Sequence, residues 1–161
     1  MKESKKLVYN FSEHGLYYDE VLDCEDIGTV TLVVDTLEIE IDYSTGNVLS
    51  ATGFLPLLKA DEKNIIIPPI GEGKFCISTK GIEYKKGIAY DYFKFFPNSK
   101  KFFINANLPC LKYDGINKRI LIGSMDDSND VYVKVNKNLI CGLDNSGNLK
   151  SILIMVDVVI K

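Results

Sequence analysis

The chain has no tryptophan, one histidine (His14) and one arginine (Arg119) among its 161 residues. Nucleophilic catalysis needs a nucleophile, a base and an orienting group within hydrogen-bond reach. A lone histidine between Glu13 and Gly15 predicts no such set, so we expect a protein that is not an enzyme. The alternative is a carboxylate-based enzyme or a carbohydrate-binding β domain, because two carboxylates suffice for glycoside hydrolysis. The absence of tryptophan, which is common in sugar-binding grooves, weighs against that alternative.

Long apolar runs are missing as well. The longest stretches, such as ILIMVDVVI near the C-terminus, fall far below the roughly 18 residues that a membrane span needs. The first residues, MKESKKLVYNF, lack the apolar core of a secretory signal. We therefore expect a cytoplasmic protein without membrane contact.

The four cysteines, Cys24, Cys76, Cys110 and Cys141, are widely separated and show no Cys-x-x-Cys spacing. No histidines stand near them to complete a zinc set. This pattern predicts four small residues of the hydrophobic core. We expect no metal site, no cofactor and no disulfide.

Positive charge is absent from a long part of the chain. Residues 7 to 58 contain no lysine or arginine but hold ten acids. These acids are Glu13, Asp19, Glu20, Asp23, Glu25, Asp26, Asp35, Glu38, Glu40 and Asp42. Residues 59 to 118 instead carry eleven lysines against six acids. Either the lysine-rich part folds against the acids, or the acids form a negative surface that attracts a basic partner.

One segment combines lysines with aromatic residues, as in proteins that bind nucleic acids. It is YKKGIAYDYFKFFPNSKKFF, residues 84 to 103. The acidic balance of the whole chain and the almost complete use of lysine over arginine oppose this function. We predict no nucleic-acid partner and interpret the lysines as residues that edge a sheet.

Strand patterns dominate the chain, which has the length of one domain spanning residues 1 to 161. In LEIEID (37 to 42), apolar and acidic residues alternate, so Glu38 and Glu40 are expected on a solvent face. Further strands are predicted at 29–35, 64–68, 74–79, 82–90, 100–106, 119–124, 130–135 and 149–160. The fold class is therefore mainly β or α+β, with antiparallel sheets forming a sandwich or half-barrel and one or two short helices.

Helical patterns are sparse. Residues 13–26 form one candidate, with Ser12 as a possible cap, and residues 55–63 form a second, with Pro56 in the first turn. Residues 90–96 fit either a strand or a helix, which Pro97 ends.

Two stretches share a Ser/Thr-Gly-Asn pattern after an aspartate, namely IEIDYSTGNVLSATGF (39 to 54) and ICGLDNSGNLKSILI (140 to 154). The acid and the glycine raise the question of a calcium loop, but the alternating acids and the distal glutamate of such a loop are absent. The pattern favours two hairpin turns, in which aspartate bonds its own backbone and glycine supplies a positive φ. It also suggests two related hairpins, one in each half of the chain.

Two resemblances bear on function. The stretch LKYDGINKRILIGS followed by NLICGLDNSGNLKSILIM resembles a small bacterial family of unknown function, although Ser151 stands where that family has glycine. The whole chain resembles, in size, acidity, lysine usage and β pattern, the immunity proteins of contact-dependent growth inhibition systems. This resemblance implies inhibition of a toxin by occlusion, in some members with addition of a toxin hairpin to an open sheet.

Together these observations predict an immunity protein that binds and neutralises a cognate basic toxin, a nuclease, without chemistry of its own. The predicted partner-binding residues supply negative charge and aromatic anchors. They are Asp19, Glu20, Asp23, Glu25, Asp26, Glu38, Glu40, Tyr17 and Tyr18. The oligomeric state is left open.

Overall fold

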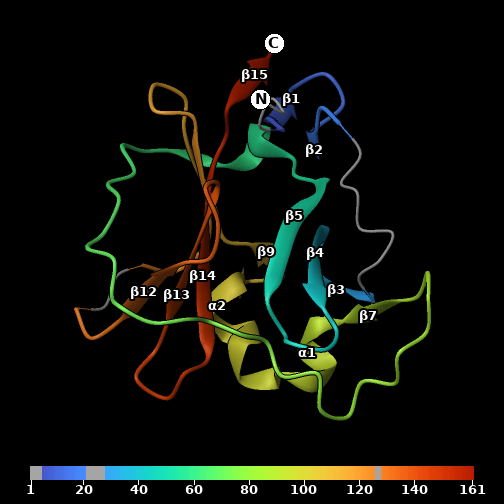
Figure 1. Ribbon diagram of the computed structural model, residues 1–161. Helices are drawn as coiled ribbons and strands as arrows, with labels where there is room; N and C mark the ends of the chain where they lie inside the picture. The colour runs from blue at the N-terminus through green and yellow to red at the C-terminus, as the bar shows by residue number, and fades with distance from the viewer. Residues whose placement is uncertain (1–4, 21–27, 126–127) are drawn as a thin grey trace.

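The computed structural model describes residues 5–20, 28–125 and 128–161, and its two main β-sheets enclose one hydrophobic core (Figure 1). Strands make up 45% of the described residues and helices 9%. The predicted β-rich fold with antiparallel sheets and short helices is therefore confirmed.

The seven-stranded sheet has the order β15-β1-β2-β5-β4-β3-β7, and the six-stranded sheet has the order β12-β13-β14-β11-β10-β6. The first contains β1 (Leu7–Asn10), β2 (Gly15–Tyr18), β3 (Thr29–Val34), β4 (Leu37–Asp42), β5 (Val48–Phe54), β7 (Ala89–Asp91) and β15 (Val158–Ile160). The second contains β6 (Asp61–Glu62), β10 (Leu111–Asp114), β11 (Arg119–Gly123), β12 (Val131–Lys134), β13 (Leu139–Leu143) and β14 (Leu149–Met155).

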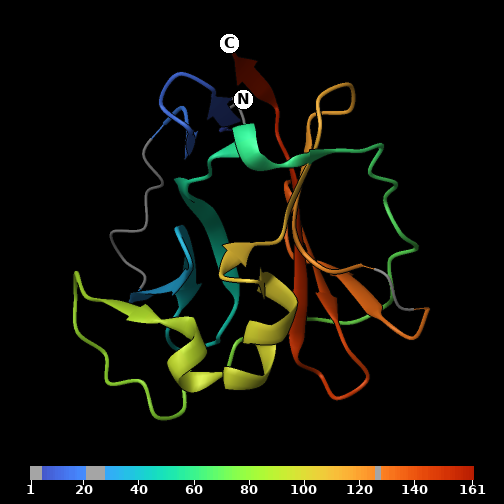
Figure 2. The ribbon, with the colours of Figure 1, turned by 180° about the vertical axis from the view of Figure 1, so that it is seen from behind.

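The remaining elements are short. They are the strand pair β8 (Ile104–Asn105) and β9 (Leu108–Pro109), the helices α1 (Tyr92–Phe95) and α2 (Lys100–Phe103), and the 3-10 turns η1 (Leu57–Lys59) and η2 (Pro97–Ser99). Both views place the two helices at one end of the molecule, between the sheets (Figure 2). Tyr92 and Phe103 extend from them into the core, where they are 3% and 1% exposed.

Alternation along β3 and β4 explains why these segments form strands. Leu32, Ile39 and Ile41 are buried in the core, whereas the residues between them point to the other face of the sheet. Period two is the spacing at which a pleated strand presents one apolar and one polar face. These two strands pair along their whole length, from Thr29 with Asp42 to Val34 with Leu37.

The six-stranded sheet is buried on both faces. Its inner face joins the main core, and its outer face carries a second, smaller cluster. That cluster consists of Ile65, Leu121, Tyr132, Ile140 and Leu153. Ile65 lies on the segment after β6, which crosses this outer face on the left of Figure 1. The chain therefore covers one sheet with a segment of its own.

The second half of the chain repeats the strand arrangement of the first half. The order β1-β2-β5-β4-β3 in one sheet corresponds to β10-β11-β14-β13-β12 in the other. We call residues 7–54 the first unit and residues 111–155 the second unit. Each unit contains a two-stranded hairpin followed by a three-stranded meander whose last strand pairs with that hairpin.

The registers of the two units match residue by residue. Tyr9 pairs with Leu16 as Tyr113 pairs with Ile120. The β4–β5 hairpin shifts register between Glu40 and Ile41, and the β13–β14 hairpin shifts at the corresponding Gly142 and Leu143. Identical residues at matching positions are Leu7 and Leu111, Tyr9 and Tyr113, Leu37 and Leu139, Asp42 and Asp144, Ser44 and Ser146, Gly46 and Gly147, Asn47 and Asn148, and Ser50 and Ser151. The recurring hairpins are therefore part of an internal duplication of five strands.

The two units also exchange strands. β6, which follows the first unit, pairs in parallel with β10 of the second unit. β15, which follows the second unit, pairs in parallel with β1 of the first unit. Each sheet is thus completed by the exit strand of the other unit.

Several predicted elements differ from the structure. Of the helix predicted at 13–26, residues 15–18 form strand β2, and residues 21–27 lie outside the described residues. The helix predicted at 55–63 is reduced to η1 followed by β6. The segments 64–68 and 74–79, predicted as strands, form no strand, and 100–106 forms α2 and then β8. Residues 90–96, left open between strand and helix, combine the end of β7 with α1.

Candidate functional site

The two stretches in which an aspartate precedes Ser/Thr-Gly-Asn, residues 42–47 and 144–148, form turns, as the sequence predicts. Asp42 Oδ1 accepts hydrogen bonds from the backbone N–H and the hydroxyl of Ser44, at 2.8 and 2.7 Å. Gly46, at φ 72°, closes this turn by donating its N–H to the carbonyl of Asp42. A positive φ of this kind is accessible to glycine at no steric cost.

The turn of the second unit is built in the same way. Asp144 Oδ1 accepts from the N–H groups of Ser146 and Asn148, at 2.9 and 2.8 Å. In both turns the carboxylate serves to hold its own backbone. Within the described ranges, no three His, Cys, Asp or Glu side chains gather as a metal would require.

A cavity with a volume of about 590 Å³ lies at the turn between β10 and β11. Glu62 and Asp114 both line it, so it is the place to examine for carboxylate chemistry. Asp114 Oδ1 accepts from the N–H groups of Ile116 and Asn117, at 3.1 and 2.9 Å. Its Oδ2 accepts from the N–H of Ile65 and from Asn117 Nδ2, at 3.0 and 2.8 Å.

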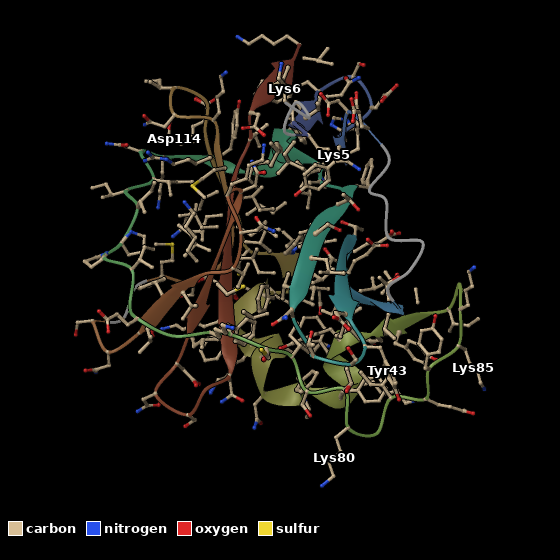
Figure 3. The ribbon with its side chains drawn as sticks, viewed as in Figure 1. Lys5, Lys6, Tyr43, Lys80, Lys85 and Asp114 are labelled. Carbon is tan, nitrogen blue, oxygen red and sulfur yellow. The ribbon has the colours of Figure 1, made fainter. Side chains whose placement is uncertain are left out.

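These donors determine what Asp114 can do. The hydrogen bonds from Asn117, first from its backbone and then from its side chain, lower the pKa of Asp114 to about 2. A general acid must hold a proton near neutral pH, and this carboxyl group does not. Its lone pairs are directed at the turn and at the segment that carries Ile65. We infer that Asp114 fastens this segment to the second unit (Figure 3).

The lowered pKa of Asp114 predicts loss of stability in acid. The unfolded carboxyl group has a pKa of about 3.9, so the stabilisation is present above pH ~4 and is lost as the pH falls through about 2. We expect the melting temperature of the wild type to decrease between these pH values. Asp114→Asn should be less stable at neutral pH and approach the wild type near pH 2. Asn117→Ala should have an intermediate slope, and parallel curves for all three proteins would contradict the assignment.

Glu38 and Glu40, two of the predicted partner-binding residues, lie on the outer face of the seven-stranded sheet. They alternate along β4 with buried Leu37, Ile39 and Ile41. Glu38 is exposed and Glu40 is half-buried, where it accepts a hydrogen bond from Ser50 Oγ at 3.2 Å. The predicted orientation of these acids towards solvent is thus observed for Glu38 and in part for Glu40.

The register gives each of these acids one neighbour on β3 and one on β5. Glu38 lies between Val33 of β3 and Thr52 of β5, and Glu40 lies between Thr31 and Ser50. Tyr17 of β2 alternates with buried Leu16 and therefore faces the same side. We call this set the first outer face. It consists of Tyr17, Thr31, Val33, Glu38, Glu40, Ser50 and Thr52, of which Ser50 is buried beside Glu40.

The other predicted residues lie elsewhere. Asp19 and Glu20 follow β2 and are exposed, and Asp19 Oδ1 accepts from the backbone N–H of Lys6 at 2.8 Å. Tyr18 alternates with Tyr17 and packs against the core, and its pKa is raised by burial. Asp23, Glu25 and Asp26 lie outside the described residues. The predicted set therefore divides into the first outer face and the end of β2.

Glu38 and Glu40 take part in none of the ion pairs that the described residues form. In the described part of the chain, ion pairs within 4.0 Å join Lys85 with Glu83, Lys137 with Asp157 and Lys150 with Asp130. Figure 3 shows Lys5 and Lys6 at one end of the molecule, near β1, and Lys80 and Lys85 at the other end. Direct pairing of lysines with the acids, which the sequence left open, is thus not seen for Glu38 and Glu40.

The cysteines differ from the prediction in part. Cys141 is buried, and burial raises the pKa of its thiol to about 12. Cys110 is half-buried, but Cys76 is exposed and its Sγ lies 3.2 Å from Asn47 Oδ1. Cys24 lies outside the described residues. The prediction of four core cysteines is therefore wrong for Cys76, because the segment 74–79 runs along the surface and forms only one bridge, to Asn47.

Thr31 and Thr52 are members of the first outer face that sequence analysis missed. The alternation of TVTLVV places Thr31 opposite the apolar face, which was a usable signal. The position of Thr52 beside Glu38 depends on the β4–β5 register, which becomes readable only when the two hairpins are aligned.

No helix among the described residues is long and apolar enough to cross a membrane. A comparison of the chain with protein-family models gives no match, and a comparison with curated protein sequences gives none either.

Proposed function

We propose that this protein binds a basic protein partner through the first outer face and inhibits that partner by occlusion. The observation that carries the proposal is the pair Glu38 and Glu40 on a sheet face whose described residues include no lysine or arginine. Charges of one sign on a surface accelerate the approach of a partner of opposite charge.

The position of the acids supports docking on a face. Sheet strands hold their side chains in fixed rows about 4.8 Å apart, so the acids and hydroxyl groups are held in place before binding. Tyr17 adds an aromatic side chain that is 37% exposed, and aromatic anchors are typical of residues that dominate binding energy. Asp19 and Glu20 extend the negative charge beyond the end of β2.

Within this proposal the partner is a nuclease toxin, and the protein is its immunity protein. Proteins that act on nucleic acids carry basic surfaces for phosphate groups, and an acidic sheet face competes for such a surface. Addition of a partner strand is a second mode of contact in this proposal. The edge strand β7 is its best candidate, because it begins with exposed Ala89 and follows directly on exposed Ile88.

Charge reversal on β4 provides the test. We expect Glu38→Lys with Glu40→Lys to weaken binding of the basic partner at least about tenfold, because attraction is replaced by repulsion at both positions. The immobilised wild type and the variant are incubated in parallel with extracts of the source cells, and retained proteins are identified by mass spectrometry. Binding to the wild type should also weaken at raised salt, since exposed charges are screened.

The matched control is Glu83→Lys, which changes an exposed acid that does not belong to this face. It should retain the same basic protein as the wild type. Co-expression of the retained protein with the wild type, but not with the β4 variant, should then preserve cell growth. Failure of the wild type to retain any basic protein at low salt, or equal retention by the β4 variant, would reject the proposal.

A further inference from the structure

The internal duplication allows the outer faces of the two units to be compared position by position. In the second unit, the outer face forms a socket that receives Ile65. The socket residues are Leu121, Tyr132, Ile140 and Leu153. Through the shared registers, these positions correspond in the first unit to Tyr17, Thr31, Glu38 and Thr52.

An extended segment fills the socket of the second unit. Ile65 is only 5% exposed, its N–H donates to Asp114 Oδ2 at 3.0 Å, and its carbonyl accepts from Arg119 Nη1 at 2.6 Å. Farther along, the N–H of Gly71 donates to the carbonyl of Tyr132 on β12 at 2.8 Å. The segment thus crosses the strands and inserts one side chain whose apolar chemistry matches its socket.

The corresponding positions of the first unit have the same backbone frame but different chemistry. Leu121 is replaced by Tyr17, Ile140 by Glu38, and Leu153 by Thr52. A carboxylate flanked by hydroxyl groups and a phenol ring is unsuited to an isoleucine side chain, because its polar groups would lose water without a partner. The same groups suit a cation, which the carboxylate pairs with and the ring attracts through its face.

We infer that the first outer face receives an extended segment of the partner and that a lysine or arginine of this segment occupies the position that Ile65 occupies in the second unit. This inference rests on the proposed function and specifies its contact. Tyr17, Glu38, Thr31 and Thr52 form the cation socket. Glu40, one row farther along β4, meets a second cation of the same segment.

The full-length protein can be tested with a fluorescein-labelled peptide of four alternating Lys-Thr pairs at low salt. Three variants are compared with the wild type. Tyr17→Leu and Thr52→Leu introduce the residues found at the matching positions of the second unit, and Glu38→Gln removes the negative charge. We expect each of the Tyr17 and Glu38 variants to bind the peptide about tenfold more weakly than the wild type. Glu83→Gln, away from the socket, should bind like the wild type. Circular dichroism confirms that each variant is folded.

Amide chemical shifts of the labelled protein locate the peptide. Changes concentrated at Thr31, Glu38 and Thr52 support the socket, whereas equal losses for Glu83→Gln and Glu38→Gln indicate unspecific charge attraction and overturn it. Retention of a basic protein that is sensitive to β4 charge reversal but insensitive to Tyr17→Leu and Thr52→Leu would overturn the socket and leave the proposed function standing. Absence of both peptide binding and protein retention would reject both.

Discussion

Replacing Asp130 with asparagine is expected to destabilise the protein by about 3–5 kcal/mol, the cost of leaving one partner of a buried ion pair uncompensated. Lys150 Nζ lies 2.9 Å from Asp130 Oδ2 and 3.0 Å from Oδ1, and the two side chains are 8% and 2% exposed. The hydroxyl of Tyr132 lies 3.2 Å from the same carboxylate, and the Lys150 ammonium lies 5.4 Å from the centre of the Phe102 ring. Asparagine keeps the size of Asp130 but leaves the ammonium without its counter-charge.

A double variant separates the pair from the packing around it. Asp130→Asn combined with Lys150→Met removes both charges, so no unpaired charge is left buried. We therefore expect the double variant to regain most of the stability that Asp130→Asn loses. Denaturation in urea, followed by circular dichroism, measures each free energy of unfolding.

The exposed pair of Lys85 and Glu83 is the control. Its side chains are 58% and 78% exposed, and such pairs contribute about 0–1 kcal/mol. Lys85→Met should therefore have little effect. A similar small loss for Asp130→Asn would show that Lys150 reaches water and that the pair is not buried in solution.

Sequence patterns predicted the strands whose formation depends mainly on local alternation. The predicted ranges 29–35, 37–42, 119–124 and 130–135 agree closely with β3, β4, β11 and β12. In each of these, apolar residues at period two find a core on one face or on both. The turns that begin at Asp42 and Asp144 were also predicted, because their hydrogen bonds join residues only two to four positions apart.

The errors arose where structure depends on distant partners. GLYY in β2 is a strand because it pairs with both β1 and β5, and the segment of Ile65 is extended without becoming a strand because it crosses a sheet. Lys150 was expected in a strand, but its burial depends on Asp130, twenty residues earlier. No local pattern contains that information.

The candidate site was predicted in its acids and in Tyr17, but not in its threonines. Glu38 and Glu40 follow from LEIEID, whereas the row that joins them to Thr31 and Thr52 follows from strand pairing. The duplication was visible as one recurring motif. Its full extent was concealed because the two outer faces now have opposite chemistry, apolar in the second unit and polar in the first.

The second prediction with a large effect on stability concerns the hydrophobic core that the two units share. Leu16 and Ile120 occupy matching positions in the two units, are 2% and 0% exposed, and belong to one cluster. Truncation of a buried leucine or isoleucine to alanine costs about 2–5 kcal/mol. We expect Leu16→Ala and Ile120→Ala each to lose stability in this range, whereas Ile116→Ala, at a side chain that is 94% exposed, should change it by no more than about 0.5 kcal/mol.

Both core variants should still unfold in one transition, although each changes only one unit. The main cluster contains residues of both units, and β6 and β15 each complete the sheet of the other unit. Loss of one unit would therefore expose the core and remove an edge strand of its neighbour. Urea titration followed by amide resonances from β2 and from β11 tests this coupling, since both sets should disappear at one midpoint. Separate midpoints would show that the two units unfold independently despite their exchanged strands.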